Sequence, residues 1–253
     1  MEQDILVITA TLGNRETLAK TIQTVKEIGG NRVKHVIVAP ASIIPKIKER
    51  YQDIEYLAEP EGKKGIYAAL NYGFHTYGKQ YKYLTFINDD DYWLPNYKLL
   101  IDSIEKNNIE LVYGKIGYIN NMGEYIRQQA CTNQFYSFLS LLHSNIILFT
   151  QQATLITSDL YFKLGGFSEQ FSLVSDTKFW IDASLLKIDY KYINAECATY
   201  RIQEGQLSSN KNMQKKETAD LLGLYSKVPK WKQIADKVKF RILNLNIYIK
   251  RFL

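Results

Sequence analysis

The chain has 253 residues, of which 46% are hydrophobic and 23% charged, and its formal net charge is +6. This length and composition suit one sizeable domain with a packed core, or one domain with a helical appendage, and the chain need not be disordered. The two cysteines, Cys131 and Cys197, are too few and too far apart for a disulfide framework or a cysteine zinc site.

The sequence carries no recognisable membrane or export signal. The N-terminus lacks the basic segment and cleavage site of a signal peptide, and no apolar run reaches the roughly 18 residues of a spanning helix. With so few cysteines, a reducing compartment is the natural setting. We therefore expect a cytoplasmic protein, either free or peripheral on the inner face of the cytoplasmic membrane.

The first half of the chain alternates strand-like and helix-like segments. Asn14 is expected to cap the first helix, and Gly29 and Gly30 to end it. This alternation predicts an α/β fold with a mostly parallel sheet flanked by helices. Strands are expected at residues 4–11, 33–39, 54–58 and 81–87, and two more helices at residues 43–51 and 66–77.

The second half is less regular. A hairpin is expected at residues 118–125, and a short helix that ends at Gly165 and Gly166. After residues 206–210 the chain becomes basic and helical in character. Further strands are expected at residues 109–115, 153–157 and 190–202, and further helices at residues 135–143 and 175–186.

Three acidic residues, Asp89, Asp90 and Asp91, follow the apolar strand at residues 83–87 after a single residue, Asn88. Ligands of such sheets bind beyond the carboxyl ends of the strands, where residues 9–11 and 39–41 also fall. Adjacent carboxylates repel one another, and a hard divalent ion such as Mg2+ or Mn2+ would offset that repulsion. The alternative is a solvated turn, or a helix start favoured by the helix dipole.

Two further segments carry candidate chemistry. Gly65 opens a helix whose backbone N–H groups could face a phosphate or sugar, and Asn71 could face the same cleft, although a plain amphipathic helix fits as well. Asp176 either caps the helix at residues 175–186 or acts as a general base on an acceptor hydroxyl. Trp180, one turn further, is either a platform for a sugar ring or part of the core.

Several other chemistries lack support in the sequence. The three histidines show no metal-ligand spacing such as HExxH. GxSxG, Walker A and GxGxxG motifs are absent. Hydrolase triads, P-loop nucleotidases and dinucleotide dehydrogenases are therefore not indicated.

From about residue 4 to residue 210, the chain resembles bacterial family 2 glycosyltransferases of the GT-A fold. Several motifs in the family's order make this more specific than any one of them. The resemblance implies a GT-A, Rossmann-like catalytic domain at residues 1–210, with a nucleotide half at 1–91 and an acceptor half at 92–210, and a basic helical extension at 211–253. The segments that carry it are ITATLGNR (8–15), GIYAALNYG (65–73), FINDDD (86–91), QAT (152–154), KLGGF (163–167) and the pair at 175–176.

The resemblance also implies a role for each candidate residue. Asp90 would be the ligand of Mn2+ or Mg2+, with Asp91 either its partner or a helix cap. Asp176 would be the base of an inverting displacement, and Gln152 and Trp180 would lie on the acceptor side. The nucleotide-sugar donor would be bordered by Thr9, Ala10, Thr11, Asn14, Arg15, Ala39, Gly65, Tyr67, Asn71, Asp89 and Asp90.

The sequence also departs from the family pattern. The turn at residues 38–42 has no acid where the family has a base-contacting one, and Ala68 replaces the family's Asp in its G-I-Y-D-A segment. Gln151 stands where a His often precedes the Q-A-T sequence. The Q-x-x-R-W motif of processive synthases is absent, which favours transfer of a single sugar.

The function implied is transfer of one sugar from a nucleotide-sugar donor, UDP-linked by family habit, to a saccharide or lipid-linked saccharide in cell-surface polysaccharide or glycolipid synthesis. Two alternatives remain open: a sugar nucleotidyltransferase, or a nucleotide- or membrane-binding module with degenerate catalysis. The region 231–253 pairs apolar residues with lysines and arginines, so it could lie on an anionic membrane or pack on the domain. No nucleic-acid partner is expected.

Overall fold

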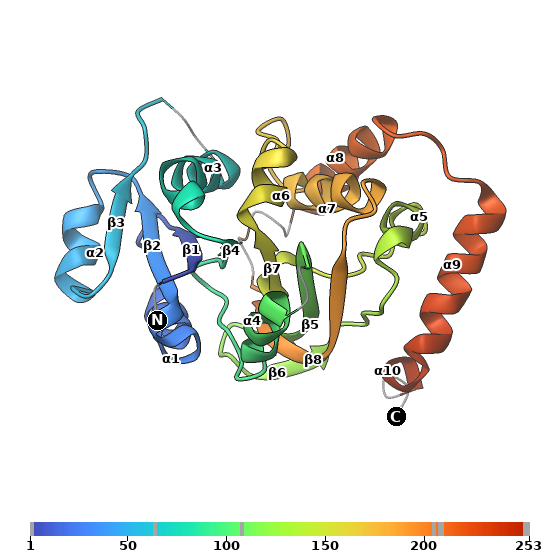
Figure 1. Ribbon diagram of the computed structural model, residues 1–253, viewed down its shortest axis with the longest axis horizontal. Helices are drawn as coiled ribbons and strands as arrows, with labels where there is room; N and C mark the ends of the chain where they lie inside the picture. Colours follow the sequence, from blue (N-terminus) through green and yellow to red (C-terminus); the bar gives the residue numbers. More distant parts are fainter. Residues whose placement is uncertain (1–2, 63–64, 107–108, 204–205, 207–209, 250–253) are drawn as a thin grey trace.

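The computed structural model describes residues 3–62, 65–106, 109–203, 206 and 210–249. Its centre is a mixed sheet with helices on both faces (Figure 1). The strands are β1 (Ile5–Ala10), β2 (Val33–Ala39), β3 (Glu55–Ala58), β4 (Tyr83–Phe86), β5 (Leu111–Ile119), β6 (Tyr125–Gln128), β7 (Thr154–Thr157) and β8 (Tyr190–Arg201). The helices are α1 (Leu18–Gly29), α2 (Ile44–Arg50), α3 (Ile66–Tyr77), α4 (Tyr97–Lys106), α5 (Phe138–Leu142), α6 (Ser158–Lys163), α7 (Ser175–Leu185), α8 (Lys211–Gly223), α9 (Lys230–Leu243) and α10 (Leu245–Ile249).

The strand order is β3-β2-β1-β4-β7-β5-β6, with β8 paired to β5. In the described part of the chain, β1, β2, β3 and β4 pair in parallel, as do β5 and β8, whereas β7 is antiparallel to both its neighbours and β6 is antiparallel to β5. The predicted α/β fold with a mostly parallel sheet is confirmed. The antiparallel pairings lie in the less regular second half.

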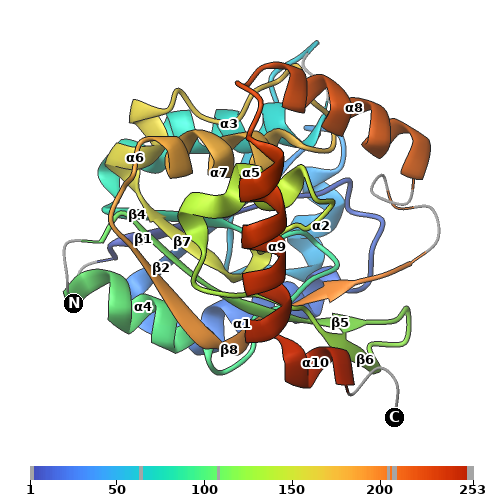
Figure 2. The same ribbon diagram turned by 90° about the vertical axis from the view of Figure 1, so that its right-hand side faces the viewer.

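Alternate side chains of β1 pack into two different hydrophobic cores, one on each face of the sheet. Leu6 and Ile8 belong to the cluster beneath α3, α5, α6 and α7, while Ile5 and Val7 belong to the cluster over α1 and α4. Successive strand side chains point to opposite faces, so a continuous apolar run such as β1 must be covered on both sides. Figures 1 and 2 show helices on both faces of the sheet.

The expected helix cap at Asn14 is wrong. α1 begins at Leu18, after a turn in which Ala19 N–H bonds the Glu16 carbonyl, and Asn14 is exposed. The hydroxyl of Thr17 donates instead to the carbonyl oxygen of Asp89, at 2.8 Å. The loop before α1 is therefore bound to the acidic run, and its path is set by that contact rather than by a local cap.

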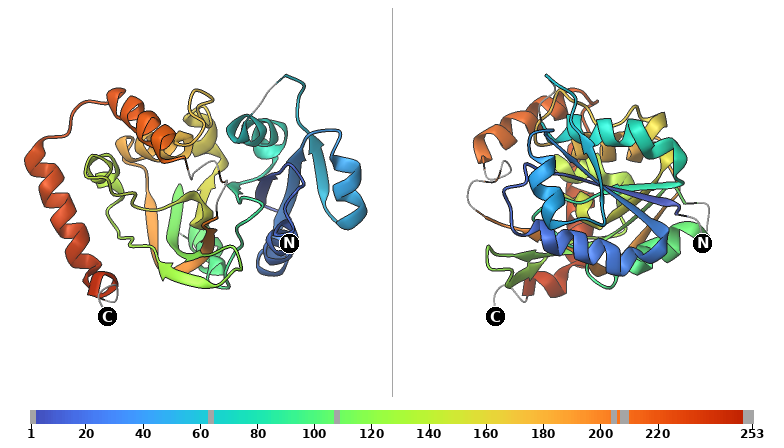
Figure 3. Two further views of the ribbon diagram at one scale, coloured as in Figure 1. Left: turned by 180° about the vertical axis from the view of Figure 1, so that it is seen from behind. Right: turned by 90° about the vertical axis from the view of Figure 1, so that its left-hand side faces the viewer.

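The C-terminal helices pack on the rest of the chain. Leu221 of α8, Phe240 of α9 and Ile247 of α10 are buried in the same cluster as α3, α5 and α7. α9 lies at one edge of the molecule, beyond α5 (Figure 3). Residues 250–253, the end of the predicted basic extension, lie outside the described residues, as do residues 204, 205 and 207–209 near the end of the predicted catalytic domain. No described helix is long and apolar enough to span a bilayer.

Candidate active site

A cavity of about 260 Å³ lies at the end of β4, where the acidic run begins. Asp89, Asp90 and Asp91 all line it and are all buried. Its wall also includes Phe149 from the loop before β7, Asp176 from α7, and residues of α8. A concave site of this kind, with convergent polar groups, is the expected form of a small-molecule site.

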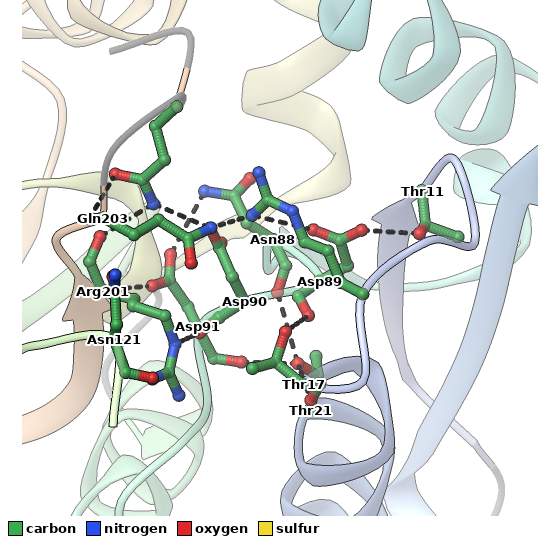
Figure 4. A network of polar contacts seen from close by, with 12 residues as sticks. Thr11, Thr17, Thr21, Asn88, Asp89, Asp90, Asp91, Asn121, Arg201 and Gln203 are labelled. Carbon is green, nitrogen blue, oxygen red and sulfur yellow. Dashed lines mark hydrogen bonds and ion pairs between the residues drawn. The ribbon is translucent and has the colours of Figure 1, made fainter. Parts of the chain in front are cut away.

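Asp89 and Asp90 are held by the loop that follows β1 (Figure 4). Arg15 forms ion pairs with both, through its Nη1 at 3.4 Å from Asp89 Oδ1 and at closer range to Asp90 Oδ2. The Thr11 hydroxyl donates to Asp89 Oδ2 at 2.6 Å. Burial raises the pKa of Asp89, while the Thr11 hydrogen bond and the Arg15 charge act in the opposite direction. One arginine thus offsets two buried carboxylates.

Two glutamines from the segment after β8 also reach Asp90. Gln206 donates its Nε2 hydrogen to Asp90 Oδ2 at 2.8 Å, and Gln203 does so at 3.3 Å. Sequence reasoning missed both, because they lie more than 100 residues along the chain from the acidic run and belong to no motif. Only the pairing of β8 with β5 brings them to this edge of the sheet.

Asp91 is bound entirely by neighbouring protein groups. Its Oδ1 accepts the backbone N–H of Arg201 at 2.7 Å, and its Oδ2 accepts Gln152 Nε2 at 2.8 Å and Asn88 Nδ2 at 3.2 Å. Burial and the Asp90 charge raise the pKa of Asp91, while these donors favour its ionised form. The Arg201 guanidinium further bonds the carbonyl of Asp90. Asp91 thereby ties the acidic run to β8 and to the segment before β7.

Asp176 begins α7 and reaches the same cavity. Its Oδ1 accepts the Tyr67 hydroxyl at 3.1 Å and the Thr177 backbone N–H at 2.7 Å. Within the described residues, no hydrogen bond reaches its Oδ2. Burial raises the pKa of Asp176 above the ordinary aspartate value. One oxygen is therefore fixed in place, and the other remains available to a ligand.

The cavity wall carries buried polar atoms that lack a partner among the described residues. Native proteins pair most buried polar groups, so a cluster of unpaired ones at one cavity indicates a polar ligand. Thr150 and Gln151 were not among the predicted site residues. The sequence had marked Gln151 only as a departure from the family, which often has a His before its Q-A-T sequence. The atoms are Asn88 Oδ1, Thr150 Oγ1, Gln151 Nε2 and Oε1, and Gln152 Oε1.

The structure brings most of the predicted site residues together. Thr11 is joined to them through its bond to Asp89. The predicted residues that line the cavity directly are Ala10, Arg15, Tyr67, Asp89, Asp90, Asp91, Gln152 and Asp176.

The remaining predicted residues do not line this cavity. Thr9 is buried within β1, and its hydroxyl bonds His35 Nε2 at 2.9 Å. Trp180 is buried in the core against Phe149, so it fits the packing reading rather than a sugar platform. Asn14 is exposed, Ala39 lies buried at the end of β2, and Gly65 precedes α3.

Asn71 faces away from the cavity. Its Oδ1 accepts the Tyr161 hydroxyl at 2.7 Å and the Phe167 N–H at 3.0 Å, and its Nδ2 donates to the Phe167 carbonyl at 2.7 Å. These bonds hold the turn after α6. The second half of the resembling segment 65–73 therefore supports the fold beside the site, while Tyr67 enters the site itself.

The donor set suits a hard divalent ion. Among the described residues, no three His, Cys, Asp or Glu side chains converge into a metal cage. Mg2+ commonly binds through one or two carboxylates plus substrate phosphates. Asp90 fits that arrangement better than Asp91, because its donors Arg15, Gln203 and Gln206 all reach Oδ2, whereas both oxygens of Asp91 accept hydrogen bonds within the described residues.

Solved structures share this fold. Over 91% of this chain and 69% of the other, the structure is similar to Staphylococcus aureus TarS 1-349 in complex with UDP-GlcNAc, with a TM-score of 0.63 and 14% identity. It is also similar to the mannosyltransferase PcManGT of Pyrobaculum calidifontis in complex with GDP-Man and Mn2+, with a TM-score of 0.61 and 14% identity over 93% and 69% of the two chains.

Sequence comparison gives the family. The Escherichia coli UDP-Glc:alpha-D-GlcNAc-diphosphoundecaprenol beta-1,3-glucosyltransferase WfgD is 27% identical over 156 residues, which cover 58% of this chain and 56% of that enzyme. The match thus spans little more than half the length of this relative. The model of glycosyl transferase family 2 matches residues 6–168, more than half of the chain, so this protein belongs to glycosyl transferase family 2.

Proposed function

We propose that this protein is an inverting glycosyltransferase that moves one sugar from a nucleotide-sugar donor to a saccharide or lipid-linked saccharide acceptor. The observation that carries the proposal is a single cavity lined both by the acidic run and by Asp176. The acidic run can hold a divalent ion that binds an anionic donor. Asp176 can act as the base that an acceptor hydroxyl needs.

The donor side of the cavity is made by Asp89, Asp90 and Arg15. Asp90 would hold Mn2+ or Mg2+, which when bound supplies positive charge to offset the charge of the leaving diphosphate. Arg15, which pairs with Asp89 and Asp90 at the same place, would contact a phosphate oxygen of the donor. Asp89 stays fixed by Thr11 and can accept a ribose hydroxyl.

The acceptor side centres on Asp176. Its Oδ2 takes the proton of the acceptor hydroxyl as the oxygen of that hydroxyl forms a bond to the anomeric carbon. The bond from that carbon to the diphosphate oxygen breaks, and its electron pair leaves with the nucleoside diphosphate. Direct displacement inverts the anomeric centre. The Tyr67 hydroxyl and the Thr177 N–H hold Asp176 in one orientation during the transfer.

The substrate classes follow from the relative. The printed name of the E. coli enzyme gives UDP-Glc as donor and a GlcNAc-diphosphoundecaprenol as acceptor. We extend a UDP-linked donor and a lipid-linked saccharide acceptor to this chain, with a role in cell-surface polysaccharide or glycolipid synthesis. Both cysteines are free and buried, which agrees with a cytoplasmic site of action.

The test measures nucleotide release from a panel of UDP- and GDP-sugars, with and without Mn2+, for the native chain and for Asp90→Ala. We expect one donor to turn over only with metal and the variant to lose that turnover. Calorimetric titration with UDP and GDP accompanies it, because turnover without an acceptor can be slow. If no nucleotide binds to the native chain in the presence of Mn2+, the proposal fails.

A further inference from the structure

Helix α9 presents two different faces. One face packs on the rest of the protein, where Phe240 joins the main core cluster and Gln233 is buried. Asn244, which follows α9, is also buried, and its Oδ1 accepts the backbone N–H of Cys131 at 3.2 Å. The helix is thus fixed to the protein along this side, as Figure 2 shows where α9 runs in front of the other elements.

The opposite face is a continuous row of exposed apolar side chains. At roughly 100° per residue, their spacing of three or four places them in one line along the helix, away from Phe240. Each is between 49% and 72% exposed. We call this row the apolar stripe; it comprises Trp231, Ile234, Val238 and Ile242 of α9, and α10, which follows the break at Asn244, adds the exposed Leu245 and Ile249.

Basic side chains flank the apolar stripe on both sides. Lys230, Lys237 and Arg241 fall along one side by the same helical geometry, and Lys232 and Lys239 along the other. Lys232 forms an ion pair with Asp236, near the packed side. Long basic side chains can keep their charge in the headgroup layer while their stems cover apolar surface.

We propose that α9 and α10 dock this protein on an anionic membrane surface, with the apolar stripe in the acyl boundary and the basic side chains against the lipid phosphates. An interfacial helix needs this combination of an apolar face, a basic rim and an aromatic residue. A second copy of the chain fits less well, because pairing two stripes would bring their basic rims together. A nucleic acid would meet the lysines but leave the stripe in water.

Docking would also tether the element that completes the cavity wall to the bilayer surface. α8 contributes Gln214 and Thr218 to the cavity wall, and only residues 224–229 separate α8 from α9. The docking itself does not depend on the proposed sugar transfer, so the two can fail separately. If both hold, the membrane surface presents a lipid-linked acceptor near Asp176.

The first test is flotation of the full chain with phosphatidylcholine vesicles, with and without phosphatidylglycerol. We expect binding only to the anionic vesicles, weakened by salt. The stripe variant Ile234→Gln/Val238→Gln/Ile242→Gln should bind at least tenfold more weakly. Its matched control replaces three exposed apolar residues elsewhere, Leu99→Gln/Met122→Gln/Leu185→Gln, and should bind as the native chain does.

A second pair of variants separates the local basic rim from overall charge. Both variants remove four positive charges, which lowers the net charge from +6 to +2 (6 − 4). We expect only the rim variant to lose at least tenfold in binding. The rim variant replaces Lys230, Lys237, Lys239 and Arg241 with Gln, and the control replaces the exposed Lys26, Lys48, Lys98 and Lys163 with Gln.

Trp231 supplies an optical readout. Of the three tryptophans, Trp231 is 72% exposed, whereas Trp93 and Trp180 are buried. Anionic vesicles should shift the emission to shorter wavelength, and brominated lipid should quench it. Trp231→Phe should abolish both effects while keeping the flotation.

Thermal unfolding and UDP titration show that each variant is folded. Three results would overturn the proposal: no binding of the native chain to anionic vesicles, equal loss in a variant and its control, or a dimer in solution that the stripe variant dissociates. The last result would assign the stripe to a second copy.

Discussion

At the scale of single residues, the three adjacent carboxylates differ in what surrounds them. Asp90 faces an arginine and two glutamines, all three of them partly exposed. Asp91 accepts buried donors from β8 and from the segment before β7. We therefore propose different roles for these two neighbours, with Asp90 binding ligands and Asp91 stabilising the fold.

Alanine at these two positions should separate the roles. Asp91→Ala leaves the N–H of Arg201 and the amide of Gln152 without an acceptor, at about 1–3 kcal/mol each, so we expect a large drop in the free energy of unfolding. Asp90→Ala also removes an acceptor, but its donors Arg15, Gln203 and Gln206 are partly exposed and can bond water, and the change relieves repulsion between carboxylates, so it should change this free energy by less than about 1 kcal/mol. Urea unfolding measures both, and equal losses would contradict the assignment.

Asp176→Asn should reduce the rate of sugar transfer by about 100- to 10,000-fold, the usual contribution of a general base. UDP binding should remain within a few-fold of native, because the asparagine keeps an oxygen for Tyr67 and Thr177. The control is Asp159→Asn, at an exposed position in α6. A variant with native turnover would remove Asp176 from the mechanism.

The same residue should set the low-pH limb of activity. Asp176 acts as a base only when ionised, and burial raises its pKa above the ordinary aspartate value. The value of kcat/KM should therefore fall as the pH drops through that raised pKa, at a higher pH than a solvent-exposed aspartate would give. A pH profile measures the midpoint, and a profile that stays flat down to about pH 4 would argue against this role.

At the scale of elements, the turn after α6 joins the site to its support. Gly165 and Gly166 both have positive φ, at 76° and 77°. A Cβ on Gly166 would lie 2.7 Å from the Tyr161 hydroxyl oxygen and 3.1 Å from Asn71 Oδ1, whereas one on Gly165 would meet nothing within 4 Å. The two glycines share a backbone conformation but differ in crowding.

This pair gives a matched test of packing against backbone strain. Gly165→Ala should lower the free energy of unfolding by about 1–2 kcal/mol, the cost of a left-handed conformation for a residue with a side chain. Gly166→Ala should cost about 1–3 kcal/mol more, because it also displaces Tyr161 from Asn71. Denaturant unfolding provides both values. If both variants lose the same free energy of unfolding, Tyr161 can move away from the new Cβ without a measurable loss of stability.

At the scale of the whole molecule, the C-terminal helices contribute buried residues to the core on one side and expose apolar residues on the other. Phe240→Ala removes a fully buried ring and should cost about 3–5 kcal/mol. Trp231→Ala, also an aromatic residue of α9 but largely exposed, should cost less than about 0.5 kcal/mol. Calorimetric or urea unfolding tests the difference. If Phe240→Ala leaves the stability unchanged, residues 211–249 form an independent extension rather than a part of the core.

Local signals in the sequence predicted most of the elements, although β5 extends to Ile119 beyond the strand expected at 109–115, and a helix near α4 was expected only in the alternative interpretation of the acidic run. Hydrophobic periodicity and glycines fixed the hairpin near residue 121, the helix from Ser175 and the long strand from Tyr190 to within one or two residues. The prediction at Asn14 failed because the loop before α1 is held by contacts with distant residues: Thr17 bonds Asp89, and Arg15 pairs with Asp90. Local capping preferences take no account of such contacts.

The sequence by itself determined the family, the order of the elements and the positions of the acidic run and Asp176, because each of these is written in contiguous residues. Only the tertiary structure decided what each polar side chain faces. Asn71, which was expected to face the cleft, instead bonds the Phe167 backbone. Gln206 bonds Asp90 although the two residues are 116 positions apart in the sequence. The tertiary structure also decided which side of α9 is covered, since this helix carries apolar residues on two opposite faces and only the face with Phe240 meets a neighbour.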